Sequence, residues 1–449
     1  MCDLDNSNFQ YSPLDFTQQK VNPVFRDEKW MQKFYETGGL KALVEILLKP
    51  EMTNIKSLIS IKCLSIISKV ICFYFPRVTF QNLFGQQNTQ QVESETIQRV
   101  ISIINNTCEY SLQREQTETE ADRMNQPLIK TYNMNYQEPI QVPENLYFES
   151  ELISYAQSLL LLTSKRNPSL LSIIYEYPKL ETMLSIGLIE CNNVFLKQKL
   201  SHGIFNLMVQ FQQVNNVERP PHKLLVPILL QTTLQKAMMC EDRSEVFFGL
   251  LTNVVNYVNL GEVNLDVDKL LAQLVKFVKE RGPKEKYQKD TDIVLHGILS
   301  LMRGLFLRFP EKAEKYGQDS KLVSELLQNC LFEIPRRASR KLVPGPKCKS
   351  HYSRSAAFKL LAELVKGSHE NLKEVINYIL PIHKNANWRT KRWVDWHITQ
   401  KNNEKSSTGY VGLKNLGCSK KKSFGKFLIQ CSLLYEFNNT TTLHDSNFP

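Results

Sequence analysis

Apolar residues recur at helical spacing along most of the chain. The clearest segment has four of them at positions i, i+3, i+4 and i+7, namely Leu40, Leu43, Val44 and Leu47. Residues with this spacing lie on one face of an α-helix, and Pro50 follows as a helix stop. The pattern therefore predicts a helix that ends just before Pro50 and buries one face.

Similar patterns predict a long series of further helices, and no strand pattern competes with them. They cover residues 53–75, 93–112, 150–164, 168–188, 193–214, 222–240, 242–258, 266–281, 289–309, 319–332, 352–366 and 369–380. A pair of such helices cannot bury its apolar faces alone. The series therefore predicts an all-α fold, an armadillo/HEAT-like helical solenoid with a short non-solenoid C-terminal tail. No strict repeat period emerges, which leaves an irregular globular helical domain as an alternative.

The turn before the first clear helix favours the repeat interpretation. Gly38 and Gly39 precede a short helix rich in leucine, valine and alanine. This arrangement resembles an armadillo repeat, in which a tight turn lets one helix pack closely across the next.

Composition divides the chain into six predicted parts. They are an N-terminal extension (1–29), helical repeats (30–112), a mobile polar loop (113–149), armadillo/HEAT-like repeats (150–383), a linker rich in tryptophan and arginine (384–408) and a C-terminal tail (409–449). The loop prediction rests on glutamine, glutamate, threonine and asparagine, which are typical of solvated segments.

Charge and targeting signals indicate where the chain is located and which kinds of partner it binds. The N-terminus has no basic segment followed by an apolar stretch, so the chain is expected in the cytoplasm or the nucleus. Residues 57–75 are the most apolar stretch, but Lys62 and Lys69 interrupt it, which predicts a buried solenoid helix and no membrane contact. The net charge of +11 is concentrated in one connector, residues 336–359, so nucleic acid is a disfavoured partner.

Cysteine spacing excludes some chemistry. The ten cysteines contain no CxxC pair, and no HExxH or phosphate-binding glycine loop is present. We therefore expect no disulfide, no metal site and no cofactor.

A specific motif lies near the C-terminal end. Residues 409–418 read Gly-Tyr-Val-Gly-Leu-Lys-Asn-Leu-Gly-Cys. They resemble the cysteine box of ubiquitin-specific proteases, G-[FY]-V-G-L-x-N-x-G-x-T-C, and the first nine of its twelve positions, seven of them specified, stand in order. The tryptophan-rich linker and the helices before it further resemble the very large members of this family, in which an armadillo-like region precedes the catalytic domain. On this resemblance, residues 409–449 are the truncated start of such a domain.

The resemblance assigns roles to single residues. Asn415 stands where the family has the oxyanion-hole asparagine, and Lys420 stands where it has the catalytic cysteine. A lysine cannot supply a thiolate there. Cys418 and Cys431 are weaker candidate thiols, and His444 is the only histidine after the box.

The family and the break in its motif together predict the function. We expect the armadillo-like protein-interaction region of a ubiquitin carboxyl-terminal hydrolase, itself inactive because the chain ends before the catalytic core. Its partners would be proteins or ubiquitinated substrates bound by the solenoid face, and ubiquitin itself only if a complete catalytic domain is present. One alternative is a fragment or altered product of an active cysteine deubiquitinase, and a second is an armadillo-like nucleic-acid or transport adaptor.

Overall fold

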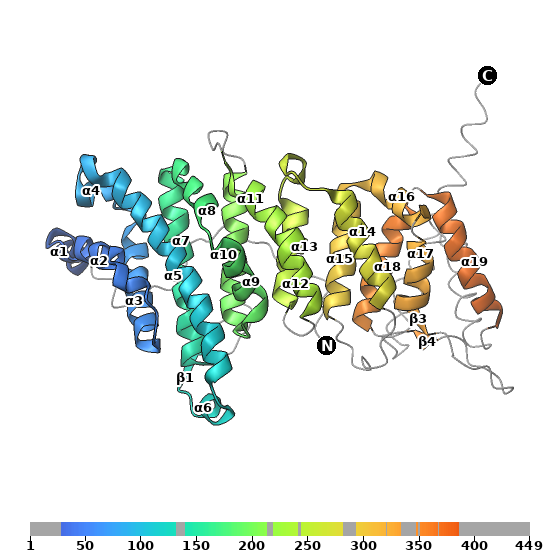
Figure 1. Ribbon diagram of the computed structural model, residues 1–449, viewed down its shortest axis with the longest axis horizontal. Coiled ribbons are helices and arrows are strands. Elements are labelled where there is room, and N and C mark those ends of the chain that lie inside the picture. Colours follow the sequence, from blue (N-terminus) through green and yellow to red (C-terminus); the bar gives the residue numbers. More distant parts are fainter. Residues whose placement is uncertain are drawn as a thin grey trace, which may run out of the picture. The chain divides into compact units, whose positions relative to one another are not determined.

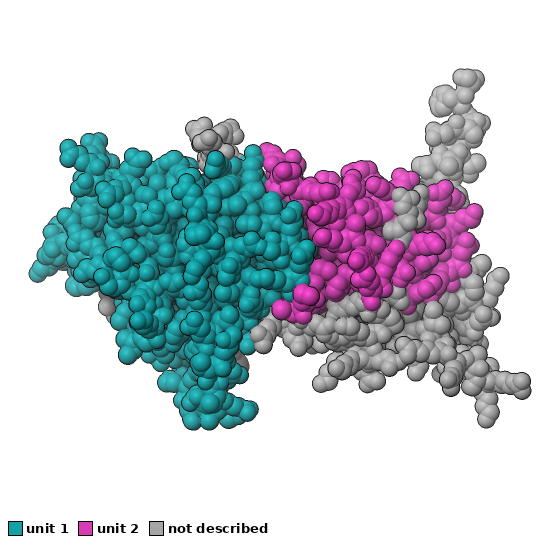
Figure 2. Space-filling view, in the orientation of Figure 1, with its two compact units in different colours: residues 1–236 teal, residues 237–449 magenta. Residues whose placement is uncertain are grey.

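The computed structural model describes residues 28–131, 140–212, 219–240, 244–281, 293–319, 321–333, 347–348, 351–366 and 368–385. The chain forms two compact units, residues 1–236 and 237–449 (Figure 2). Helices make up nearly all of the described residues in both units (Figure 1). The predicted all-α, helical-solenoid class is confirmed.

Unit 1 is a stack of helices with one hairpin. Its long helices are α1 (Glu28–Glu36), α2 (Gly39–Leu48), α3 (Leu58–Tyr74), α5 (Thr89–Thr117), α7 (Glu144–Arg166) and α10 (Val194–Phe211). Its shorter elements are η3 (Pro50–Thr53), α4 (Phe80–Phe84), η4 (Gln86–Asn88), α6 (Glu120–Met124), β1 (Leu128–Thr131), β2 (Ile140–Pro143), η5 (Pro168–Leu171), α8 (Ser172–Glu176), α9 (Leu180–Ser185), η6 (Ile186–Glu190), α11 (Pro221–Ile228), η7 (Leu229–Thr233) and the start of α12 (Leu234–Met239).

Helix α7 is the centre of unit 1. It packs against α3, α5 and α10, which accounts for buried residues on more than one of its faces. Leu152, Ile153 and Leu159 are fully buried there. Burying one such side chain stabilises a fold by about 1.5–3 kcal/mol, so α7 anchors its three neighbours.

The glycine pair at the start of α2 has the role expected from the sequence. Gly38 adopts a left-handed conformation with φ +81°, which favours glycine. A Cβ atom on Gly39 would come within 2.3 Å of the Phe34 ring. The two glycines thus allow the turn and the close approach of α1 to α2.

Unit 2 is a second stack of helices. It contains α13 (Glu245–Tyr257), η8 (Leu260–Glu262), α14 (Val267–Arg281), α15 (Ile293–Arg308), α16 (Pro310–Asp319), α17 (Leu322–Glu325), η9 (Leu326–Leu331), α18 (His351–Val365), α19 (His369–Asn385) and the short strands β3 (Phe332–Glu333) and β4 (Lys347–Cys348). α15 packs against both α13 and α18, and its Leu305 and Phe306 are buried.

The prediction of a polar loop over residues 113–149 is wrong for the residues that the structure describes, 113–131 and 140–149. α5 continues to Thr117, α6 and the antiparallel β1–β2 hairpin follow, and α7 already begins at Glu144. Thr119 and Asp122 form a capping box that starts α6, so polar residues there build secondary structure instead of a loop. The boundary between the compact units lies at residue 236, not in this segment.

Two further predictions need correction. The hairpins β1–β2 and β3–β4 contradict the expectation of no strands. The single helix predicted over residues 168–188 is broken between α8 and α9 at Pro178, because proline disfavours a helical conformation in the residue before it.

The apolar segment at residues 57–75 forms α3, as predicted, but not as a helix buried on all sides. Ile59 and Ile66 are 72% and 58% exposed. None of the described helices is both long enough and apolar enough to cross a membrane.

His202 on α10 gives unit 1 a pH-dependent stability. Burial, helped by the charge of Lys199, lowers its pKa below the ordinary value of 6.5. The unfolded chain therefore takes up this proton first as the pH falls, so stability present above about pH 6.5 is lost below it. We expect the urea midpoint to fall between about pH 7.5 and pH 5. The fall should be smaller in His202→Gln, and an equal fall in both proteins would contradict this assignment.

Candidate interaction site

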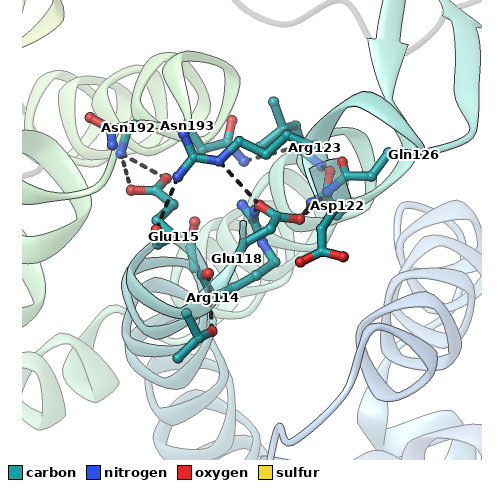
Figure 3. Close-up of polar contacts among 12 residues, drawn as sticks. Arg114, Glu115, Glu118, Asp122, Arg123, Gln126, Asn192 and Asn193 are labelled. Carbon is teal, nitrogen blue, oxygen red and sulfur yellow. Dashed lines mark hydrogen bonds and ion pairs between the residues drawn. The ribbon is translucent and has the colours of Figure 1, made fainter. Parts of the chain in front are cut away.

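A buried polar cluster joins the C-terminal end of α5 to the N-terminal ends of α7 and α10 (Figure 3). Arg114 of α5 lies between two carboxylates. Its Nε donates to Glu149 of α7 at 2.8 Å, and its Nη1 donates to Glu118 at 2.6 Å. Glu149 is fully buried, whereas the side chains of Arg114 and Glu118 are about one-tenth exposed (12% and 10%). Such charge-assisted bonds are roughly twice as strong as neutral ones.

Two neutral side chains also donate hydrogen bonds to Glu149. Ser111 of α5 donates its hydroxyl to Oε2 at 2.8 Å, and the Asn193 side-chain amide donates to the same oxygen at 2.8 Å. Asn193 is also the N-cap of α10, since its Oδ1 accepts from the backbone N–H of Leu196. One carboxylate therefore fixes the start of α10 against α5 and α7. We call these residues, together with Arg114 and Glu118, the junction.

Glu115 forms a second link between α5 and α10. The backbone N–H of Asn192 donates to both of its carboxylate oxygens, at 2.7 and 2.6 Å. Burial raises the pKa of Glu115, although the Asn192 N–H and Arg114 act in the opposite direction. A carboxylate just before α10 also interacts favourably with the positive end of that helix.

The junction supports a projecting element made of α6 and the β1–β2 hairpin (Figure 1). Glu118 accepts hydrogen bonds from Gln126 and Asn145 and pairs with Arg123, which also donates to the Glu115 carbonyl. In the capping box that starts α6, hydrogen bonds from Thr119 hold the pKa of Asp122 below its usual range.

The projecting element exposes apolar side chains. Met124 is 78% exposed and Leu128 is 57% exposed, and the Arg123 side chain beside them is 55% exposed. We call these three residues the tip. Methionine and arginine are enriched in surfaces that contact other proteins. The junction joins this surface to the stack of α5, α7 and α10.

Comparison with known proteins points to one family. No family model matches the chain. Human ubiquitin carboxyl-terminal hydrolase 34 is 27% identical over 205 residues, which are 44% of this chain and 6% of that protein. Ubiquitin carboxyl-terminal hydrolase puf of Drosophila melanogaster is 30% identical over 183 residues, 40% of this chain and 4% of that protein. Human ubiquitin carboxyl-terminal hydrolase 9Y is 25% identical over 214 residues, 44% of this chain and 8% of that protein.

The chain is a relative of the large ubiquitin carboxyl-terminal hydrolases. This confirms the family that the cysteine box of residues 409–418 resembles. The chain spans less than a tenth of the length of the curated relatives it matches.

The residues that the family resemblance singles out lie outside the described residues. This holds for Asn415, Cys418, Lys420 and Cys431, and for the linker 384–408 after Asn385. Their roles therefore stay predictions. The described residues contain no group of three or more histidine, cysteine, aspartate or glutamate side chains that could hold a metal ion.

The described thiols of this hydrolase relative are poor nucleophiles where they are buried. Burial raises the pKa of Cys191 to about 12 and raises the pKa of Cys72 and Cys108 as well. A reactive cysteine needs the opposite, a lowered pKa in a partly exposed, electropositive setting.

Sequence reasoning missed the junction altogether. Arg114, Glu118 and Glu149 fell inside the segment predicted to be a mobile loop, where charged residues looked solvated. Arg114 and Glu118 are spaced i, i+4, which was the one available signal that α5 continues. Nothing in the sequence marks Asn193 as the partner of Glu149, because 44 residues separate them.

Proposed function

We propose that the chain is an armadillo-like protein-interaction region of a ubiquitin carboxyl-terminal hydrolase of the ubiquitin-specific protease type. The observation that carries this proposal is the junction, which joins the exposed tip to the stack of α5, α7 and α10. Similarity to hydrolases of far greater length supports the family assignment. Helical stacks of this kind bind proteins along extended surfaces.

In this proposal the chain does not itself cut isopeptide bonds. Lys420 stands at the position of the catalytic cysteine in the box, and an ammonium group cannot replace a thiolate. Its partners are then other proteins or ubiquitinated substrates, in the cytoplasm or the nucleus. Ubiquitin itself would be bound only where a complete catalytic domain is present.

The alternative is that the chain is part of an active cysteine deubiquitinase. The first nine positions of the cysteine box, seven of them specified, stand in order and support this second candidate. In that case Asn415 would stabilise the oxyanion of the acyl-transfer step, and the nucleophile would be a thiol.

The tip offers a direct test of the interaction role. We expect the variant Met124→Ser/Leu128→Ser to melt at an unchanged temperature, because both side chains are exposed. The amount of each partner captured by the full chain, quantified by mass spectrometry, should fall about ten-fold or more, because central apolar contacts dominate binding energy. Met239→Ser, at a residue that is 85% exposed, is the matched control. Equal capture by all three proteins would argue against binding through the tip.

A further inference from the structure

Helix α3 presents an apolar stripe that no described helix covers completely. The stripe consists of five residues spaced alternately by four and three, namely Ile59, Cys63, Ile66, Val70 and Phe73. Ile59 and Ile66 are 72% and 58% exposed, Cys63 is exposed, and the other two are partly buried. We call this set the α3 stripe. Its opposite face, with Ile61, Leu64 and Ile71, is fully buried.

The spacing of the α3 stripe is that of a helix–helix seam. Positions that alternate by four and three residues keep one line facing a partner helix. From Ile59 to Phe73 the line is about 21 Å long, enough to contact several turns of another helix. An ordinary outward face of a helical stack is polar, and exposed large isoleucines on one line mark a contact surface.

Lysines border the α3 stripe on the side that faces α7. Lys62 forms an ion pair with Glu144 at 2.7 Å and lies over the Phe148 ring, 5.5 Å from its centroid. Lys69 lies over the Tyr155 ring at 5.9 Å. These contacts hold both ammonium groups at the edge of the stripe, where Lys69 can meet an incoming carboxylate.

The segment that carries the α3 stripe is itself basic. No aspartate or glutamate occurs from residue 52 to residue 92, whereas Lys56, Lys62, Lys69 and Arg77 do. On α7, Glu144 pairs with Lys62, and Glu151 interacts with Tyr155, the ring under Lys69. An apolar seam bordered by positive charge is complementary to a helix with an apolar face and acidic flanks.

We propose that the α3 stripe binds an acidic amphipathic helix of a partner protein. Apolar residues of that helix cover Ile59 and Ile66, and its carboxylates pair with Lys56 and Lys69. This inference rests on the proposed function in taking the chain as a protein-interaction region, and it adds a second surface, separate from the tip, with a stated partner chemistry.

The test uses the full chain and a defined probe. The probe is a fluorescein-labelled peptide of about eighteen residues, with leucine at heptad positions a and d and mostly glutamate elsewhere. We expect saturable binding by fluorescence anisotropy and slower alkylation of Cys63 in the complex, measured by mass spectrometry. Ile59→Ser/Ile66→Ser and Lys56→Glu/Lys69→Glu should each weaken binding about ten-fold or more. Circular dichroism checks that both variants stay folded.

The matched controls separate this proposal from that of the tip. Met124→Ser/Leu128→Ser should bind the peptide with unchanged affinity, so a failure of either surface leaves the other testable. A peptide with lysine in place of glutamate should bind at least ten-fold more weakly. Equal affinity for the lysine peptide, or unchanged affinity of Ile59→Ser/Ile66→Ser, would overturn the proposal. Two other results would overturn it, if Ile59→Ser/Ile66→Ser abolishes them. One is formation of a dimer of the chain, and the other is binding to anionic vesicles without binding to the peptide.

Discussion

Replacing Glu149 by alanine is expected to lower the free energy of unfolding of unit 1 by about 3 kcal/mol or more. Glu149 is fully buried and accepts from Arg114, Ser111 and Asn193. Its removal leaves three donors without this buried acceptor. Arg114 keeps Glu118 as a partner, which places the expected loss at the lower end of values for broken buried pairs.

Urea unfolding followed by far-ultraviolet circular dichroism measures this loss. Hydrogen exchange should show faster exchange in the facing ends of α5, α7 and α10, because the junction joins these ends. Lys179→Ala is the matched control, since Lys179 and Glu109 form an ion pair at 3.1 Å whose side chains are 58% and 31% exposed. That change should cost less than about 1 kcal/mol.

A double variant distinguishes a buried ion pair from simple loss of packing. Arg114→Met/Glu149→Leu should be less destabilised than the sum of its single variants, because it removes both charges at once. A Glu149→Ala loss no larger than that of Lys179→Ala would show that the junction contributes little to stability.

Periodicity and helix stops were sufficient to predict the fold class. The spacing of Leu40 to Leu47 and the position of Pro50 gave α2 nearly to the residue. The glycine pair was interpreted correctly, because the left-handed turn at Gly38 and the close approach at Gly39 both need glycine. These signals are local, so the sequence carries them without knowledge of the packing.

The errors come from features that only packing decides. Residues 113–149 are rich in polar side chains, but several of these point inward to one another at the junction. The α3 segment is apolar around most of its circumference, which suggested complete burial. In the structure one line, Ile59 to Phe73, is left partly or fully exposed. Composition cannot distinguish a buried face from an exposed apolar one.

The functional features likewise include one that the sequence predicted and one that only the structure shows. The cysteine box indicated the family, and similarity to human and Drosophila melanogaster hydrolases agrees with it. The tip, in contrast, required the structure, because Met124 and Leu128 lie in the segment predicted to be a loop. A short motif can identify a relationship, while an interaction surface depends on which residues remain exposed after folding.

We propose that this chain binds proteins and does not cleave isopeptide bonds. It should then form no covalent adduct with a reactive ubiquitin. A ubiquitin-specific protease reacts irreversibly with ubiquitin that carries a thiol-trapping group at its C-terminus, because the catalytic thiolate attacks that group. On the family resemblance, Lys420 stands where that thiolate would be, and burial raises the pKa of Cys72, Cys108 and Cys191. None of these four residues should therefore form the adduct with ubiquitin.

The most direct measurement is the reaction of the purified full chain with this ubiquitin probe, followed by intact-protein mass spectrometry. An active ubiquitin-specific protease serves as the positive control, and Cys418→Ser/Cys431→Ser identifies the origin of any adduct. We expect no adduct under conditions in which the positive control is fully modified. A stoichiometric adduct that is lost in Cys418→Ser/Cys431→Ser would show that the chain carries a catalytic thiol, and it would contradict the proposed function.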